Sequence, residues 1–464
     1  MLSGALAEGF DPLDHPFALA DSLVFLPTRR AARGFGVALL DAAREITGSP
    51  SIALPRIATL GDPDEAEFLA SLSFRPDISG FSLQGPEPVD LLQRKLVLAR
   101  LTQHWAKSLT PALRERYGGE EIILPASAAD ALWLAEDLTR LMDQVETEEV
   151  DWSAIRDVLP AEHAEWWQLT LAFLNIVMEA WPGHLEELGL VNPARHRSVL
   201  ADLRIRTLQE NPPKGLVIAA GTTGSIPSTS RLLAAISKLP NGAVVLPGLD
   251  TSLTTDVIRQ LQESEERSRE SVISTHAQFG MCRLLKTLRI RHEEVAALAP
   301  AEPVEAIRET AIHAALLPAD QSASWTESRA GLDENELAEA FEQVAVLEAA
   351  NERQEALAIA LALREAVEDP AHSAALVTPD RDLARRVSAE LERFGIEIDD
   401  SAGQPISITP LARFLRNMIR SADDGADPVA VAAFVKDALL FDGEERQACE
   451  LLELAFSDFA NASV

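Results

Sequence analysis

A Gly-rich turn carries residues that are well placed to bind a ligand. Thr222, Thr223, Ser225 and Pro227 follow the apolar run Leu216–Ala220, which has the character of a strand buried on both faces. In open α/β sheets, ligands bind at the carboxyl ends of the strands. The turn is therefore a candidate site, and we expect it to face a cleft between two α/β domains.

A second group of candidate residues is Thr28, Arg29, Arg30 and Arg33, at the start of a helix that the pattern predicts over Arg29–Ile46. Three arginines at this end of a helix oppose its macrodipole, so something should compensate them. One interpretation is a solvated helix end. The other is a contact with backbone phosphate, because guanidinium groups and helix-start amides both suit that ligand.

The groups that hydrolyse ATP are missing. A phosphate-binding loop needs a Gly-Lys pair followed by a hydroxyl, and the sequence contains no Gly-Lys dipeptide. A magnesium-binding carboxylate is also absent after the core strand, because Leu216–Ala220 leads directly into Gly221. No Gly-x-Ser-x-Gly elbow and no convincing nuclease constellation occurs. The sequence thus predicts no catalytic residue in this chain, and no ATP hydrolysis.

Composition limits the classes of function further. The net charge of −32 argues against a general nucleic-acid binder, although a local basic groove or a basic partner subunit is compatible with it. Cys282 and Cys449 are the two cysteines, which excludes a Cys-rich metal or iron–sulfur site within this chain and suits a reducing cytosol. His163 and His184 lack partners at ligand spacing, so no metal is expected. No stretch is apolar and long enough to span a bilayer, so we expect a cytoplasmic protein without a membrane partner.

The order of elements predicts an α/β fold. Residues 1–87 and 211–300 form a first domain with strands at Ser22–Leu26, Ser51–Leu60, Leu216–Ala220 and Ala243–Pro247. Residues 88–210 read as helices only and interrupt it. Ser228 or Ser230 is expected to cap the helix after the Gly-rich turn.

A second α/β domain is predicted over residues 341–422, after an Ala/Pro-rich, acidic boundary at 301–340. Its expected strands are Gln343–Glu348, Ala374–Thr378 and Ile396–Ile398. Residues 423–464 are predicted to begin a further helical domain that is truncated. Two α/β domains, the first split by a helical insertion, resemble a helicase motor, and this resemblance implies two RecA-like domains.

Several runs spread along the chain carry a more specific pattern: Val24–Arg33, Leu54–Ile57, Glu146–Trp152, Glu179–Pro182, Ala219–Pro227, Ala243–Asp250, Ala356–Arg364, Ala375–Asp380 and Asp400–Pro405. In these runs the sequence resembles the AddB family of double-strand-break repair proteins, of the alphaproteobacterial type. The resemblance covers almost the whole chain.

The resemblance implies a subunit of a helicase–nuclease that processes DNA double-strand breaks for recombination. ATP would be used by an AddA-type ATPase–nuclease partner. The iron–sulfur cluster and magnesium of the family belong to a nuclease domain that this chain lacks, and the chain is about half the expected length. The resemblance also implies that Thr28, Arg29, Arg30 and Arg33 touch single-stranded DNA, and that Ser225–Pro227 links the nucleotide and DNA sites.

Two alternatives stay open at this point. One is a purely structural partner subunit without DNA contact, which the net charge favours for the isolated chain. The other is a two-domain α/β enzyme with a small-molecule site at Thr222–Pro227, which the absence of a catalytic constellation disfavours.

Overall fold

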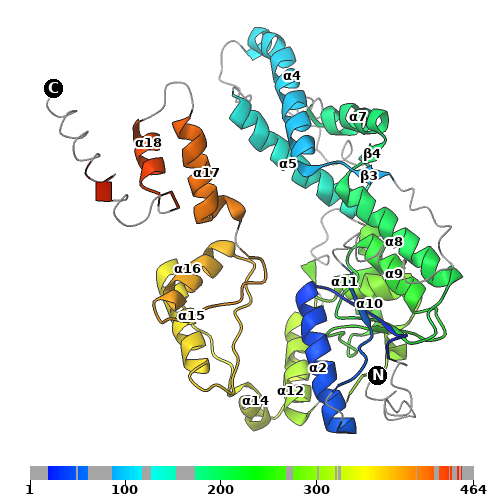
Figure 1. The fold of residues 1–464 in the computed structure, drawn as a ribbon. Helices are drawn as coiled ribbons and strands as arrows, with labels where there is room; N and C mark the ends of the chain where they lie inside the picture. The colour runs from blue at the N-terminus through cyan, green and yellow to red at the C-terminus, as the bar shows by residue number, and fades with distance from the viewer. Residues whose placement is uncertain are drawn as a thin grey trace. The chain divides into compact units, whose positions relative to one another are not determined.

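The computed structural model describes residues 19–48, 51–60, 86–117, 127–152, 173–267, 275–299, 302–318, 321, 325–403, 405–422, 428–437, 439–440, 447–448 and 451. It is a mixed α/β fold, mostly helical, with a small parallel sheet (Figure 1). The α/β class predicted from the sequence is therefore confirmed. The chain divides into two compact units, Met1–Val344 and Ala345–Val464.

The sheet of the first unit has four parallel strands in the order β2-β1-β5-β6. They span Leu23–Leu26 (β1), Arg56–Thr59 (β2), Val217–Ala220 (β5) and Gly242–Val245 (β6). β2 begins only after Pro55, because proline cannot donate to a ladder, so the predicted strand is shortened. β6, predicted over Ala243–Pro247, is half-buried because it lies at the end of the sheet order.

The crossover helices lie on opposite faces of this sheet. Phe25 and Val217 pack with apolar residues of α8 (Pro193–Glu210), α9 (Pro227–Ile236) and α11 (Phe279–Leu288) in one core. The neighbouring row of side chains points the other way, since residues alternate along a strand. In that row Ile57 lies 3.9 Å from the Cβ position of Gly36 in α2 (Arg29–Thr47).

The helical insertion has a core of its own. α4 (Leu91–Tyr117) and α5 (Ala128–Thr147) lie side by side (Figure 1) and share a cluster with η4 (Ile176–Ala180) and α7 (Trp181–Leu188). Trp181 is fully buried in it. Residues 88–210 were predicted to be helical only. β3 (Glu87–Pro88) and β4 (Leu190–Val191) correct this, because they form a short parallel pair, with β3 at the start of the insertion and β4 just before α8.

An ion-pair cluster joins the insertion to the sheet domain. Arg231 of α9 donates two hydrogen bonds to Glu149, of 2.5 and 2.9 Å, just after α5. It also donates to Asp202 of α8, at 3.1 and 3.2 Å. The hydrogen bonds from Arg231 hold the pKa of Glu149 below its usual value. Three segments distant in sequence are thus tied at one guanidinium group.

Helices complete the first unit: α10 (Thr255–Arg267), η6 (His292–Glu294), α12 (Pro303–Leu316), α13 (Trp325–Ala330) and α14 (Glu334–Phe341). Three of them, α12, α13 and α14, begin within residues 301–340, which the sequence predicted to be a boundary.

The second unit contains α15 (Glu352–Ala366), α16 (Arg381–Glu392), η8 (Ile406–Ile408), α17 (Pro410–Ser421) and α18 (Pro428–Val435). The sequence predicted strands at Gln343–Glu348, Ala374–Thr378 and Ile396–Ile398, and this is wrong, because the structure has no strand in any of these segments. Leu376 and Ile396 pack against the α15–α16 core, but no pairing strand is present within the described segments. Much of residues 423–464 lies outside the described residues, as does Cys449.

Candidate functional site

The two stretches singled out in the sequence meet at one edge of the sheet. The chain leaves β1 toward β2 on one side, and β5 and β6 lie on the other side, so β1 and β5 flank a topological switch point. Phe25 pairs with Ala219 in the parallel register, which brings the following residues of each strand together. A Cβ on Gly221 would lie 3.4 Å from Pro27. The turns after β1 and β5 are therefore in contact.

The turn after β1 is built by a helix cap. The Thr28 hydroxyl accepts a hydrogen bond of 3.0 Å from the Ala31 amide, so α2 begins as predicted. Arg29, Arg30 and Arg33 are exposed on the first turns of α2, which contains no acidic residue in its first turn. Because the Thr28 hydroxyl already takes part in the helix cap, the exposed guanidinium groups are the more available donors for a ligand here.

The turn after β5 depends on two glycines in the left-handed region, Gly221 with φ of 79° and Gly224 with φ of 63°. The Thr222 hydroxyl accepts a hydrogen bond of 3.3 Å from the Gly224 amide and so closes the turn. Thr223 and Ser225 are exposed, and their hydroxyls are accessible.

The helix after this turn begins differently from the prediction. Pro227 is its first residue and Ile226 is the N-cap, without a side-chain hydrogen bond. Ser228 and Ser230 therefore lie inside the helix, and the prediction that one of them caps it is wrong. The physical reason is that proline suits the first helical position, which fixes the start at residue 227.

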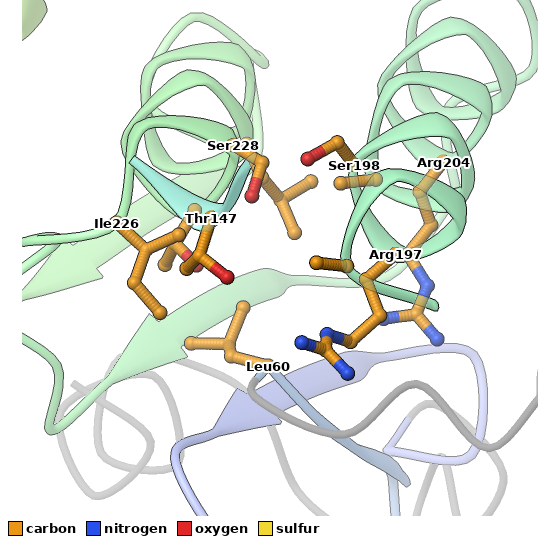
Figure 2. Close-up of a pocket in the computed structure, with 11 residues that line it drawn as sticks. Leu60, Thr147, Arg197, Ser198, Arg204, Ile226 and Ser228 are labelled. Carbon is orange, nitrogen blue, oxygen red and sulfur yellow. The ribbon is translucent and has the colours of Figure 1, made fainter. Parts of the chain in front are cut away.

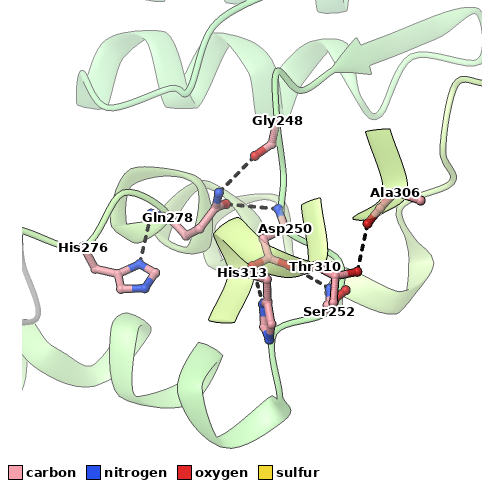
Figure 3. Close-up of polar contacts among 8 residues, drawn as sticks. All are labelled: Gly248, Asp250, Ser252, His276, Gln278, Ala306, Thr310 and His313. Atoms are coloured by element: carbon pink, nitrogen blue, oxygen red, sulfur yellow. Dashed lines mark hydrogen bonds and ion pairs between the residues drawn. The ribbon is translucent and has the colours of Figure 1, made fainter. Parts of the chain in front are cut away.

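Sequence reasoning missed a polar network beyond β6 (Figure 3). His313 of α12 and Asp250 form a pair with 2.6 Å between Nδ1 and Oδ2. Gln278 donates to the Gly248 carbonyl at 3.0 Å and accepts from the Asp250 amide at 3.2 Å. The signal that could have found it is an acidic residue shortly after a strand end. Its histidine partner lies 63 residues further on, and no local pattern connects them.

Two other residues near this network have structural roles. His276 accepts a hydrogen bond from the Gln278 amide at 3.1 Å, in the turn before α11. Burial, with the nearby Asp250 charge, raises the pKa of the Cys282 thiol to about 11. A neutral, buried thiol is a poor nucleophile.

The chemistry this edge offers is binding. Exposed guanidinium groups, hydroxyls and helix-start amides are donors that suit an anionic ligand such as phosphate. Gly221 stands at the end of β5, where a magnesium-dependent motor would need a carboxylate. Within the described ranges, no three His, Cys, Asp or Glu side chains gather as a metal site.

No helix in the described part of the chain is both long and apolar enough to cross a membrane. No protein-family model matches the chain, and the search of curated proteins found no match.

Proposed function

We propose that this chain is a non-hydrolysing, helicase-like subunit of an AddAB-type helicase–nuclease that processes DNA double-strand breaks. In this proposal its two units correspond to RecA-like domains, the first interrupted by the helical insertion. The turns after β1 and β5 bind single-stranded DNA or DNA ends, in the cytoplasm, beside an AddA-type ATPase–nuclease subunit that supplies ATP hydrolysis.

The observation that carries this proposal is the contact between the two turns at the switch point of the sheet. Both turns carry residue types that suit an anionic ligand, and they follow neighbouring strands although they are far apart in sequence. A switch point is where open α/β sheets bind ligands. The exposed arginines supply positive charge there, and neither turn supplies the groups that ATP hydrolysis requires.

The test measures binding of a fluorescent single-stranded oligonucleotide to the full chain, alone and with the ATPase partner, across salt concentrations. Replacing Arg29 and Arg30 together by Ala should weaken binding. If each arginine contacts one phosphate, the slope of log K against log salt should fall in magnitude by about 1.4, since each contact to a single strand contributes about 0.7.

A matched control replaces Arg385 of α16 and Arg393, the residue just after it, which are both exposed and pair with carboxylates of that helix. This double variant removes the same charge and should leave DNA binding unchanged. Equal losses in both double variants, or no DNA binding even with the partner present, would contradict the proposal.

A second function is favoured by one observation. The net charge of −32 opposes approach to DNA, which suits a subunit that only braces its partner. In that case the chain should copurify with the ATPase subunit, and the Arg29 and Arg30 substitutions should leave DNA processing by the complex unchanged.

A further inference from the structure

A small pocket lies between the helical insertion and the sheet domain, with a volume of about 50 Å³ (Figure 2). Its walls come from α8, from the first turn of α9, from Thr147 at the end of α5 and from Leu60 after β2. Pockets for drug-sized organic ligands span roughly 300–1,000 Å³, and one water occupies about 30 Å³ of liquid. Only a compact group fits here.

The charge of the lining is unusual for this chain. Acidic residues outnumber basic ones, 73 to 41, over the whole sequence. Among the described residues that line the pocket, however, the charged side chains are Arg197 and Arg204 of α8, and no carboxylate lines it. The nearby Glu149 and Asp202 bind Arg231 instead. The pocket is therefore a local positive site in an acidic protein.

The two arginines are held differently. Arg204 is 9% exposed, donates to the Thr59 carbonyl at 3.3 Å and lies 5.7 Å from the Phe25 ring centroid, which fixes its guanidinium group against the sheet. Arg197 is exposed at the pocket and has no ion-pair partner within the described part of the chain. Figure 2 shows both guanidinium groups on the α8 side. Arg197 is free to bind a ligand there.

Hydrogen-bond donors face these arginines from α9. Ser228 is only 9% exposed and its hydroxyl points into the space between α8 and α9, without a hydrogen-bond partner among the described residues (Figure 2). The first turn of α9 has no side-chain cap, so the Ser228 and Thr229 amides need acceptors from elsewhere. Hydrogen-bond donors without acceptors, placed next to positive charge, favour the binding of an anion with several acceptor oxygens.

We propose that this pocket binds a tetrahedral oxyanion of the phosphate class, held by Arg197, the Ser228 hydroxyl and the first-turn amides of α9. An anion bound there would connect the helical insertion to the sheet domain. The ligand is either a free phosphate or the phosphodiester of a nucleic-acid strand, which share this chemistry. The proposal stands on the pocket and is independent of DNA binding by Arg29 and Arg30.

The test titrates the full chain with inorganic phosphate by calorimetry, at constant ionic strength with chloride as the balancing anion. The Arg197→Gln variant should weaken phosphate binding by about tenfold or more, because it removes a charge-assisted hydrogen bond. Ser228→Ala should weaken it by about two- to tenfold, the range for one neutral hydrogen bond. Arg206→Gln, an exposed arginine of the same helix, is the matched control and should bind phosphate as the wild type does.

A second arm distinguishes the two sources of the ligand. If the pocket takes a phosphodiester, a single-stranded oligothymidylate competes with phosphate, and Arg197→Gln weakens its binding more than Arg206→Gln does. If it takes the free anion, phosphate binds with the same dependence on Arg197 but the oligothymidylate does not compete. Absence of phosphate binding by the wild type, or equal phosphate affinities of Arg197→Gln and Arg206→Gln, overturns the proposal. Thermal unfolding in chloride verifies that each variant is folded.

Discussion

Gly224 lies where the turn after β5 meets two buried helices. Its φ of 63° is a conformation that residues with a Cβ rarely adopt. A Cβ would also lie 2.9 Å from Leu284 and 3.1 Å from Leu233, whose side chains are 1% and 0% exposed. Both leucines belong to the buried core around the sheet, so moving them would disturb its packing, and glycine is favoured here for two separate reasons.

Gly224→Ala should lower the free energy of unfolding by about 2–4 kcal/mol, from backbone strain and overpacking together. Urea unfolding followed by tryptophan fluorescence measures this. The control is Gly34→Ala in the interior of α2, where no atom lies within 4 Å of the Cβ position. It should stabilise the protein by roughly 0.5–1 kcal/mol, because alanine favours helix. A neutral result for Gly224→Ala would show that the turn moves to accommodate the methyl group.

Glu149 makes stability depend on pH in a predictable direction. Its pKa in the folded protein is lowered, chiefly by the hydrogen bonds from Arg231. A carboxyl group with a lowered pKa stabilises the folded protein at pH values above its pKa in the unfolded chain, which is near 4.5. This stabilisation is lost as the pH falls through the pKa of the group in the folded protein. Glu149→Gln should therefore unfold at a lower temperature than the wild type at neutral pH, and the difference should shrink in acid below that range.

Calorimetric melting at several pH values measures this difference. Glu187→Gln, at an exposed carboxylate of α7, is the control and should change the melting temperature little at any pH. A deficit of Glu149→Gln that stays constant into strong acid would contradict the ion-pair explanation.

At the scale of elements, α4 and α5 are joined by two ion pairs in different surroundings. The Arg94 side chain is fully buried, and its guanidinium nitrogen lies 2.8 Å from a carboxylate oxygen of Asp143. The Asp143 side chain is 36% exposed. Lys95 and Glu136 pair at 2.7 Å with both side chains exposed. A buried cation that loses its partner is costly, whereas an exposed pair adds little.

Asp143→Asn should therefore lower the free energy of unfolding by about 2–4 kcal/mol, because Arg94 would stay charged and buried. Glu136→Gln, on the same helix pair, should have a far smaller effect. Replacing Arg94 and Asp143 together by leucine should recover much of the loss, since it removes the buried charge itself. Chemical denaturation of the four proteins tests this, and equal effects of the two single variants would show that burial does not govern the pair.

Local chemistry accounts for most of the helix starts, although it misplaced the start of α9. The helix predicted from Arg29 begins there, capped by Thr28, and Asn351, Asp380 and Thr409 cap later helices in the same way, because each cap forms within three residues of sequence. Strands were less predictable, since a strand needs a partner that the local pattern does not contain. Gln343–Glu348, at the boundary of the two units, and the apolar runs of the second unit have strand-like sequences but no neighbour in the sheet order.

In the candidate site, too, the local features were predictable from the sequence and the long-range contacts were not. Residue types identified the turns after β1 and β5 separately, because phosphate-binding and turn-forming residues are recognisable in short segments. Their contact follows from the pairing of Phe25 with Ala219, and the Asp250–His313 pair follows from packing of α12. Both depend on long-range folding, so neither could be inferred from spacing.

At the scale of the whole molecule, the two units differ in how their backbones are hydrogen-bonded. Val217–Ala220 lies between two strands, and Val217 is fully buried. In the second unit, the apolar segments are open to solvent, with Val346 92% and Val377 93% exposed. Large exposed apolar side chains on extended backbone are typical of surfaces that another element can cover.

Hydrogen exchange measured by mass spectrometry should therefore separate these segments. Amides of residues 374–378 should exchange rapidly, whereas those of Val217–Ala220 should be strongly protected, because amide exchange requires loss of the sheet hydrogen bonds. The α15 helix, between the two apolar segments, is the internal control for folding of the second unit. Strong protection at residues 374–378 would show that they pair as strands in solution.

The position of β5 beside β1 has a consequence for folding while the ribosome synthesises the chain. The Leu216 amide binds the Ser22 hydroxyl across 194 positions of sequence. At about 5–20 residues per second, a ribosome needs roughly ten to forty seconds to make that stretch. During this interval β1 has a neighbour on only one side, and the apolar faces that α9 and α11 later cover stay open. The helical insertion emerges in that time, so the nascent chain needs protection from aggregation until β5 arrives.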